Sequence, residues 1–276
     1  MSISYRTHAV RVAAKREMRS TLYGIGFYVT LALIFLATSY FFVNSSIRST
    51  LDAGILALRN PITEPFFFSV GLAATYLGLC SALSVSRDRD QGTMEVLFYG
   101  PVDAVSYLMG KFVHQMLAFI VVLLFALVNF YLVSLATNLG FTADFIGFLV
   151  LSLFLTSCMV SFGIFLSVST RRMMASVIVF LGLVLFFLAF SVAHTVIMSL
   201  PGQGMTPLMV YVRVIIDNMN EVMKWISPIS YFSRGMAAVF MRDYAQYGVS
   251  LLSSVVYSGI LLTVSVWLFK KKGVRR

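Results

Sequence analysis

The chain has 276 residues, of which 59% are hydrophobic and only 12% are charged. Soluble globular proteins carry about 25% charged residues, so this composition excludes an ordinary soluble domain and indicates that a lipid bilayer is the solvent. A formal net charge of +10 would by itself suggest a nucleic-acid partner. The basic residues instead gather beside apolar stretches, which favours a membrane surface and no nucleic-acid partner.

Residues 5–21 predict a short amphipathic helix on the membrane surface. Apolar residues recur at every fourth position, and basic residues recur one position further round the helix. Such a helix suits the cytoplasmic headgroup layer, beside anionic lipid. The alternative is a solvated basic segment that only sets the orientation of the chain. The apolar residues are Val10, Ala14 and Met18, and the basic ones are Arg11, Lys15 and Arg19.

Six apolar stretches are each long enough to cross a membrane. A spanning helix needs roughly 20 residues, because the hydrocarbon layer is about 30 Å thick and each residue rises about 1.5 Å. Uninterrupted stretches of this length satisfy their backbone hydrogen bonds as helices, whereas barrel strands are shorter and alternate. We therefore expect an all-α integral membrane fold, with residues 1–276 forming one polytopic domain. The expected spans are residues 22–43, 65–85, 112–135, 145–168, 173–198 and 247–269.

The basic residues predict the orientation of these spans. Fifteen of the 21 Lys and Arg residues lie in the first 21 residues, in residues 86–111, at Arg171 and Arg172, and in the tail from residue 270. All four segments share one side if there are six spans. Basic residues resist translocation and are enriched on the cytoplasmic side. We expect a multi-pass protein of the cell membrane with both termini in the cytoplasm, and a first span that is retained because it exceeds a signal-peptide core.

Small residues occupy one face of the second span, at positions 71, 75, 78 and 82. Small side chains let helix backbones approach closely in lipid, so this face predicts tight helix packing. A subunit interface would use the same face. The two cysteines, Cys80 and Cys158, lie within spans and indicate small buried apolar side chains, with neither a disulfide nor a metal site.

Residues 199–246 form a long segment that the topology places outside the cell. Apolar residues from position 208 to 226 follow a 4-3-4-3-4 spacing, which predicts an amphipathic helix. Ser227 and Pro228 end it, and residues 229–240 form a second helix that is too short to span. Helices of this length usually re-enter the membrane or lie on its surface. The pair is therefore an outer lid on a pathway or a packed cap.

Catalytic chemistry is not indicated anywhere in the chain. All 11 acidic residues lie in loops or near span ends, and so do His114 and His194, whereas ion relays place such groups at membrane depth. The sequence has no H-E-x-x-H zinc motif and no G-x-S-x-G motif. It also lacks a P-loop, because Gly110 and Lys111 are followed by Phe112. We expect no catalytic residue, metal or cofactor on this chain, and any ATP and Mg on a partner.

Residues 86–111 carry the densest charge cluster and resemble a known family. They read Arg-Asp-Arg-Asp-Gln-Gly-Thr-Met-Glu-Val-Leu over residues 87–97, followed by Pro101-Val102 and later by Gly110-Lys111. This is similar to the acidic-Gly-Thr-Leu-Glu-x-Leu-Leu, Pro-Val and Gly-Lys pattern of type-2 ATP-binding-cassette (ABC-2) permeases. Two more segments resemble that family: Lys15-Arg16-Glu17-Met18 its N-terminal interfacial helix, and Ser227-Pro228, Tyr231-Phe232 and Gly235 its segment before the last span.

The resemblance implies a dimer of six-helix subunits, identical or not, each docked on a cytoplasmic ABC ATPase, that exports cargo or extracts it from the bilayer. Residues 86–111 would be the coupling element, with charge pairs around an apolar anchor as at many interfaces. Gly92 and Pro101 would bracket a short helix there. The expected coupling residues are Arg87, Asp88, Arg89, Asp90, Gly92, Thr93, Glu95, Leu97, Phe98 and Pro101. The expected residues of the interfacial helix are Arg11, Lys15, Arg16, Glu17 and Arg19. The expected residues of an outer gate are Ser227, Pro228, Tyr231, Phe232 and Gly235.

Two other functions remain open at this point. An ion-coupled secondary transporter needs no partner chain, but the lack of charges at mid-membrane positions argues against it. A membrane scaffold or assembly factor that does not transport could use the same charged segment to recruit a protein.

Overall fold

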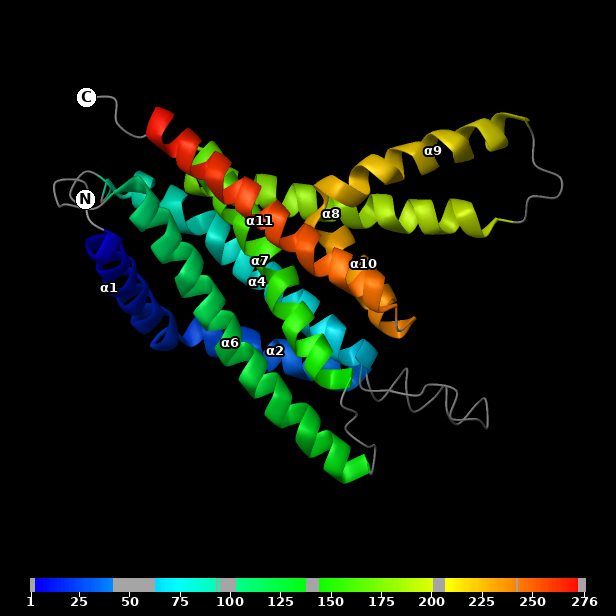
Figure 1. The fold of residues 1–276 in the computed structure, drawn as a ribbon, viewed down its shortest axis with the longest axis horizontal. Helices are drawn as coiled ribbons and strands as arrows, with labels where there is room; N and C mark the ends of the chain where they lie inside the picture. Colours follow the sequence, from blue (N-terminus) through cyan, green and yellow to red (C-terminus); the bar gives the residue numbers. More distant parts are fainter. Residues whose placement is uncertain are drawn as a thin grey trace.

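A computed structural model describes residues 3–41, 63–92, 94, 103–137, 144–200, 207–241 and 243–272. All regular secondary structure in these ranges is helical, which confirms the all-α fold. Figure 1 shows the helices, which are α1 (Ile3–Leu22), α2 (Ile25–Phe41), α4 (Thr63–Asp90), α6 (Ala104–Thr137), α7 (Asp144–Ser169), α8 (Met173–Ser199), α9 (Pro207–Ile226), α10 (Pro228–Phe240) and α11 (Tyr244–Lys272).

Five of the six expected spans are present as long apolar helices. Helices α4, α6, α7, α8 and α11 are each long and apolar enough to cross a membrane, so the protein is a multi-pass membrane protein. The predicted first span differs. It begins later than predicted, at Ile25 in α2, because a turn at Tyr23 and Gly24 separates it from α1, and 17 residues of α2 are described. The last two residues of that predicted span lie outside the described residues.

The second and third spans extend further than predicted, into residues 86–111. Helix α4 continues to Asp90, and α6 begins at Ala104. The charges that were expected in a loop therefore form the last turn of α4, where Arg87 and Arg89 complement the negative end of the helix dipole. Gly92, at a φ of 66°, ends this helix with its N–H donating to the carbonyl of Arg89 over 3.2 Å.

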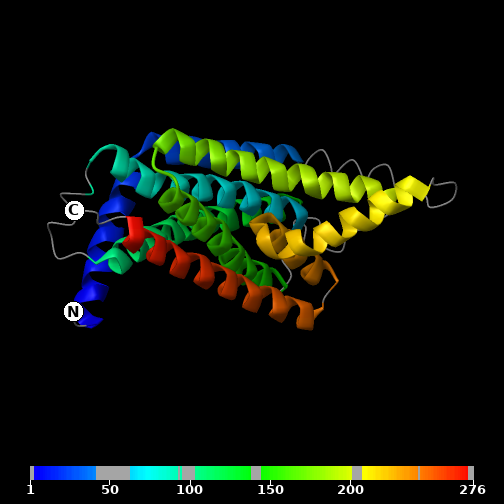
Figure 2. The ribbon, with the colours of Figure 1, turned by 90° about the horizontal axis from the view of Figure 1, so that it is seen from above.

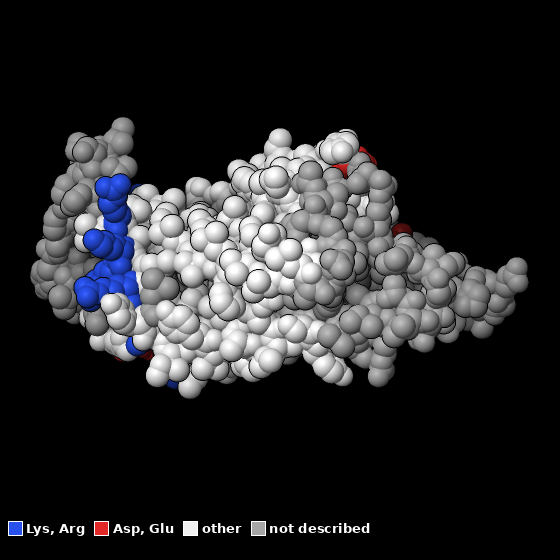
Figure 3. Space-filling model, turned by 90° about the horizontal axis from the view of Figure 1, so that it is seen from below, with Lys and Arg blue, Asp and Glu red and all other residues white. Residues whose placement is uncertain are grey.

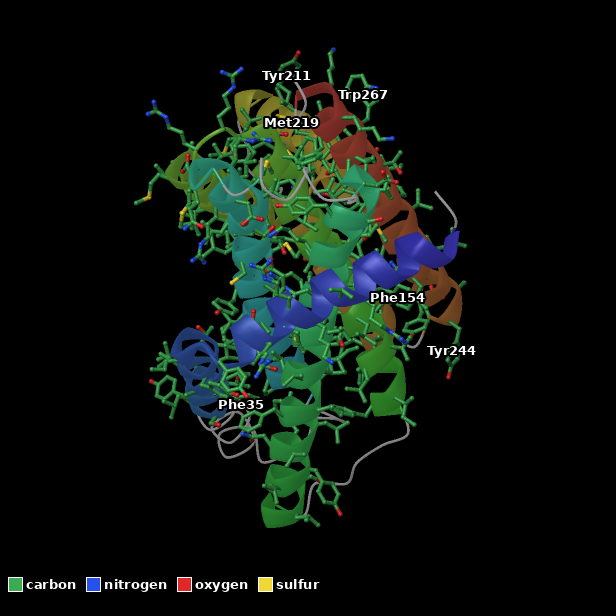
Figure 4. All side chains as sticks on the ribbon, turned by 90° about the vertical axis from the view of Figure 1, so that its left-hand side faces the viewer. Phe35, Phe154, Tyr211, Met219, Tyr244 and Trp267 are labelled. Carbon is green, nitrogen blue, oxygen red and sulfur yellow. The ribbon has the colours of Figure 1, made fainter. Side chains whose placement is uncertain are left out.

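The described helices form a bundle with α1 lying across one end (Figures 1 and 2). Helices α1 and α6 pack together, and Figure 4 looks onto this end, where α1 crosses α6. The C-terminal end of α11 and the turn between α7 and α8 lie at the same end (Figure 1). Helices α8 and α9 run side by side and project beyond the rest of the bundle at the opposite end (Figure 2).

The closest helix packing occurs between α4 and α7. A Cβ atom on Gly163 would lie 2.2 Å from the carbonyl oxygen of Gly78 and 2.9 Å from the Cβ of Ser81. A Cβ on Gly78 would lie 2.8 Å from the Phe180 ring of α8. The small face predicted on the second span is therefore used inside the subunit at Gly78, which confirms the packing interpretation there. At Gly71, a Cβ would meet nothing within 4 Å.

The segment before α11 contains the two predicted helices, and their ends agree with the sequence pattern. Helix α10 packs between α7 and α11, and a Cβ on Gly235 would lie 3.0 Å from the Leu151 side chain. The hydroxyl of Tyr257 donates to the carbonyl of Ile226 over 2.8 Å. Because Tyr257 lies near the middle of α11, this bond holds the turn between α9 and α10 beside the middle of that helix.

Candidate functional site

Three helices meet at the ammonium group of Lys111, near the start of α6. Its Nζ lies 2.8 Å from Asp88 Oδ2 on α4 and 3.3 Å from Glu17 Oε1 on α1. It also donates to the carbonyl of Ser84 over 3.0 Å. The Lys111 side chain is only 6% exposed, and a buried charge is tolerated only when it is paired. These contacts therefore tie α1, α4 and α6 together at one atom.

The aromatic ring of Tyr107 extends this network toward α11. Its hydroxyl donates to Asp88 Oδ2, and its ring centroid lies 5.2 Å from the Nζ of Lys111. The ring also contacts Phe269, near the end of α11, with a stacked geometry and 5.6 Å between centroids. A displacement of the C-terminal end of α4 would therefore displace α6 and α11 as well.

Arg89 and Asp90 connect the same end of α4 to the turn between α7 and α8. Arg89 donates from Nη1 to the carbonyl of Thr170 over 2.9 Å. Asp90 Oδ2 accepts the backbone N–H of Met173, the first residue of α8, over 2.8 Å. The preceding residue, Arg172, makes no side-chain cap hydrogen bond, so Asp90 caps α8 from a neighbouring helix. Its carboxylate also complements the positive end of the α8 dipole.

Buried serines hold the last turns of α4 against α7 and α8. The Ser167 hydroxyl of α7 accepts the backbone N–H groups of Val85 and Ser86 over 3.0 and 2.9 Å. The Ser176 hydroxyl of α8 donates to the carbonyl of Ala82 over 2.6 Å. All these groups are buried, and unpaired polar groups in such positions are costly. The end of α4 is thus fixed to its neighbours by polar contacts on several sides.

The structure brings together some of the predicted coupling and interfacial residues. Asp88 and Glu17 share Lys111, while Arg89 and Asp90 hold the α7–α8 turn. The sequence pattern contains Lys111 only as part of the Gly-Lys pair, without a role, and gives no sign of Tyr107. Arg87, Gly92, Arg11, Lys15, Arg16 and Arg19 are exposed; Thr93, Glu95, Leu97, Phe98 and Pro101, with the short helix expected between Gly92 and Pro101, lie outside the described residues.

The residues expected at an outer gate surround the turn between α9 and α10. Ser227 precedes α10, Pro228 begins it, and both are buried. The Tyr231 hydroxyl donates to the carbonyl of Trp225 over 3.2 Å. Phe232 is partly buried, against the core.

Arg234 is central to this turn but is not among the residues that the sequence predicts there. Its guanidinium lies 4.8 Å from the ring centroid of Trp225 and 4.6 Å from that of Tyr231. It donates from Nη2 to the carbonyl of Lys224 over 2.8 Å. A cation between two aromatic rings is stabilised by their π electrons. An arginine three residues after a tyrosine in a short apolar helix is the signal that could have identified it.

Comparison with protein-family models matches residues 12–274 to the family described as ABC-2 family transporter protein. The chain belongs to the ABC-2 transporter family. The match covers nearly the whole chain, from α1 to the end of α11, and includes the Lys111 network and the α9–α10 turn. Search of the curated proteins finds no match. Membership makes the chain a membrane transport component without an ATPase of its own, and implies association with ABC ATPase subunits.

Proposed function

We propose that this chain is the permease subunit of an ATP-driven exporter, that two permease subunits form the substrate pathway, and that separate cytoplasmic ATPase subunits drive them through residues 86–111. The main support is the polar network around Lys111. The end of α4 leads directly into residues 93–102, and it is bonded to α1, α6 and the α7–α8 turn. A force applied to this segment would therefore move several helices together.

The end of the bundle that carries this network is the cytoplasmic one in this proposal. Lys and Arg residues gather in one band at the α1 end of the face shown in Figure 3, and the enrichment of basic residues on the cytoplasmic side supports this orientation. Cytoplasmic ATPases would meet the exposed side chains of Arg87 and Asp90 there. The uncharged character of the spans favours ATP over an ion gradient as the source of energy.

Helices α9 and α10 are proposed as a gate on the opposite side. Their connecting turn lies beside the middle of α11, so the pair would enter the membrane from outside and return. Three side-chain hydrogen bonds reach carbonyl groups at the end of α9: Tyr257 to Ile226, Tyr231 to Trp225 and Arg234 to Lys224. Each contributes about 1 kcal/mol, a scale at which ATP binding can shift the balance between two conformations.

The experiment that tests this function purifies the permease from its native membranes under conditions that retain partners. An ABC ATPase subunit is expected to copurify with the wild-type chain and to hydrolyse ATP. Glu95→Arg reverses a charge in the proposed docking segment, and Gly92→Pro removes the N–H that donates to Arg89. Both variants should reach the membrane but lose the ATPase or its coupling.

Lys270→Gln provides the control, because it removes an exposed charge near the end of α11 outside the Lys111 network. It should retain the ATPase. Full retention and coupling of the ATPase in Glu95→Arg and Gly92→Pro would contradict the docking role. Retention of the ATPase in the wild type, without any ATP-dependent transport, would instead favour a scaffold.

A further inference from the structure

An open groove with a volume of about 960 Å³ lies between α1 and the first turns of α6. Ala14 and Met18 line it from α1, and Val105, Met109 and Val113 line it from α6. On each helix these positions are four residues apart, so each helix presents one continuous apolar stripe. The groove therefore has apolar walls on both sides, and each wall is several helical turns long.

Three cations line the same groove. Arg11, Lys15 and Arg19 each follow an apolar stripe position by one residue, and all three side chains are exposed. Residues four apart on a helix are separated by about 6 Å along its axis, so the cations form a row along one rim. The single acidic residue in the α1 sequence, Glu17, lies 3.3 Å from Lys111. It is therefore engaged with a cation of α6.

The inner end of the groove opens onto an apolar flank of α6. Leu117 lines this end and is 40% exposed. Beyond it, Ile120 and Leu124 continue the same helical face and are also exposed. In a membrane protein such a flank faces the hydrocarbon of the bilayer. The groove thus connects a row of cations with the lipid-facing surface.

We propose that this groove binds one anionic phospholipid of the cytoplasmic leaflet. An acyl chain lies between the stripes of α1 and α6, and the phosphate lies on the row formed by Arg11, Lys15 and Arg19. The groove and a lipid of this leaflet have matching layouts, with charge at the headgroup level and apolar surface below it. An anionic lipid is favoured over a zwitterionic one, because a zwitterionic lipid offers the row its own ammonium group as well.

The bound lipid would contact both α1 and α6 and hold them together beside the pair formed by Glu17 and Lys111. It would thereby act as a structural part of the subunit, which goes further than a general attraction of α1 to the membrane surface. This proposal depends on the placement of α1 and not on ATPase coupling. Loss of either property can therefore be observed without loss of the other.

Native mass spectrometry of the purified full-length protein tests the proposal by titration with phosphatidylglycerol or phosphatidylcholine that carry the same acyl chains. The wild-type protein should retain one phosphatidylglycerol more tightly than phosphatidylcholine. The triple variant Arg11→Gln, Lys15→Gln, Arg19→Gln should weaken phosphatidylglycerol binding about fivefold for each charge removed. Binding of phosphatidylcholine should not change.

Two further variants decide between this site and a general surface charge. The control Arg171→Gln, Arg172→Gln, Lys270→Gln removes three exposed cations elsewhere and should leave the preference intact. Met109→Trp keeps every cation and fills the groove, so it should also weaken phosphatidylglycerol binding, even if the triple variant fails to fold. Equal affinity for both lipids in the wild type, equal losses in the control and in the triple variant, or unchanged binding in Met109→Trp would each overturn the proposal.

Discussion

The ammonium of Lys111 and the carboxylate of Asp88 form a 2.8 Å ion pair that joins the start of α6 to the end of α4. The pair is asymmetric in its surroundings, because the Lys111 side chain is 6% exposed whereas that of Asp88 is 20% exposed. The lysine therefore depends on its partners more than they depend on it. Glu17 is the second partner of Lys111, and its side chain is more exposed to water than that of Asp88, at 42%.

Lys111→Met should destabilise the protein by about 2 kcal/mol, because Asp88 and Glu17 lose the cation that they share. The loss is limited because water can still reach both carboxylates. Asp88→Asn should be milder, since Lys111 retains Glu17 and the carbonyl of Ser84. Unfolding of the purified protein in mixed detergent, followed by circular dichroism, measures both values. The double variant should show a coupling energy of about 1 kcal/mol or more. Additive losses would mean that the pair contributes nothing.

Asp90→Ala should weaken the start of α8 by about 1 kcal/mol, because the N–H of Met173 loses its acceptor. Amide hydrogen exchange of a peptide covering residues 171–176 is the measurement, with faster exchange expected in the variant. Asp90→Asn keeps an acceptor oxygen and is the matched control. Equal protection in wild type and Asp90→Ala would show that the α4 end does not cap α8.

Gly163→Ala should destabilise the α4–α7 contact by about 3 kcal/mol, at the upper end of overpacking effects. The added methyl would lie 2.2 Å from the Gly78 carbonyl oxygen, which belongs to a helix backbone and cannot rotate away. Gly71→Ala on α4 is the control, since a Cβ there meets nothing within 4 Å. Thermal unfolding of the two variants in detergent should separate them clearly. Similar midpoints would rule out such close packing.

Gly92→Ala should cost about 1–2 kcal/mol at the end of α4, because a φ of 66° is unfavourable for a residue with a Cβ. Gly92→Asn should be tolerated better, as asparagine adopts this conformation more readily. Hydrogen exchange of the backbone amides of residues 89–92 measures the fraction of molecules in which the end of α4 is helical. An alanine variant as protected as the wild type would show that the left-handed turn is not required.

The sequence predicts the long apolar spans closely, and the reason is visible in α7 and α8. The expected ends at residues 145–168 and 173–198 differ from the observed helices by one residue or less at each end. Apolar residues fill these spans continuously, and Arg171 and Arg172 mark the turn between them. Other spans differ more: α4 and α6 extend into residues 86–111, and α2 begins at Ile25 because the chain turns at Tyr23 and Gly24 after α1.

The charged ends of α4 and α6 could not be assigned from the same pattern. A hydropathy window ends at the first charges, although a helix can continue when those charges find partners. The partners of Lys111 are Glu17, which is 94 residues away in sequence, and Asp88 on the preceding helix. The packing of α1 across α6 brings Glu17 to Lys111, and the packing of α4 against α6 brings Asp88 to it. Arg234 was missed for the same reason, since Trp225 belongs to a different helix.

Labelling of a cysteine on the proposed outer side is the most direct test of ATP-driven motion. Ser233 is exposed on α10, so Ser233→Cys can be followed with a membrane-impermeant maleimide in the complex with its ATPase, with the labelled site identified by mass spectrometry. A non-hydrolysable ATP analogue should change the labelling rate, and Lys111→Met should abolish that change while the ATPase remains bound. An identical labelling rate with and without the analogue would contradict the account.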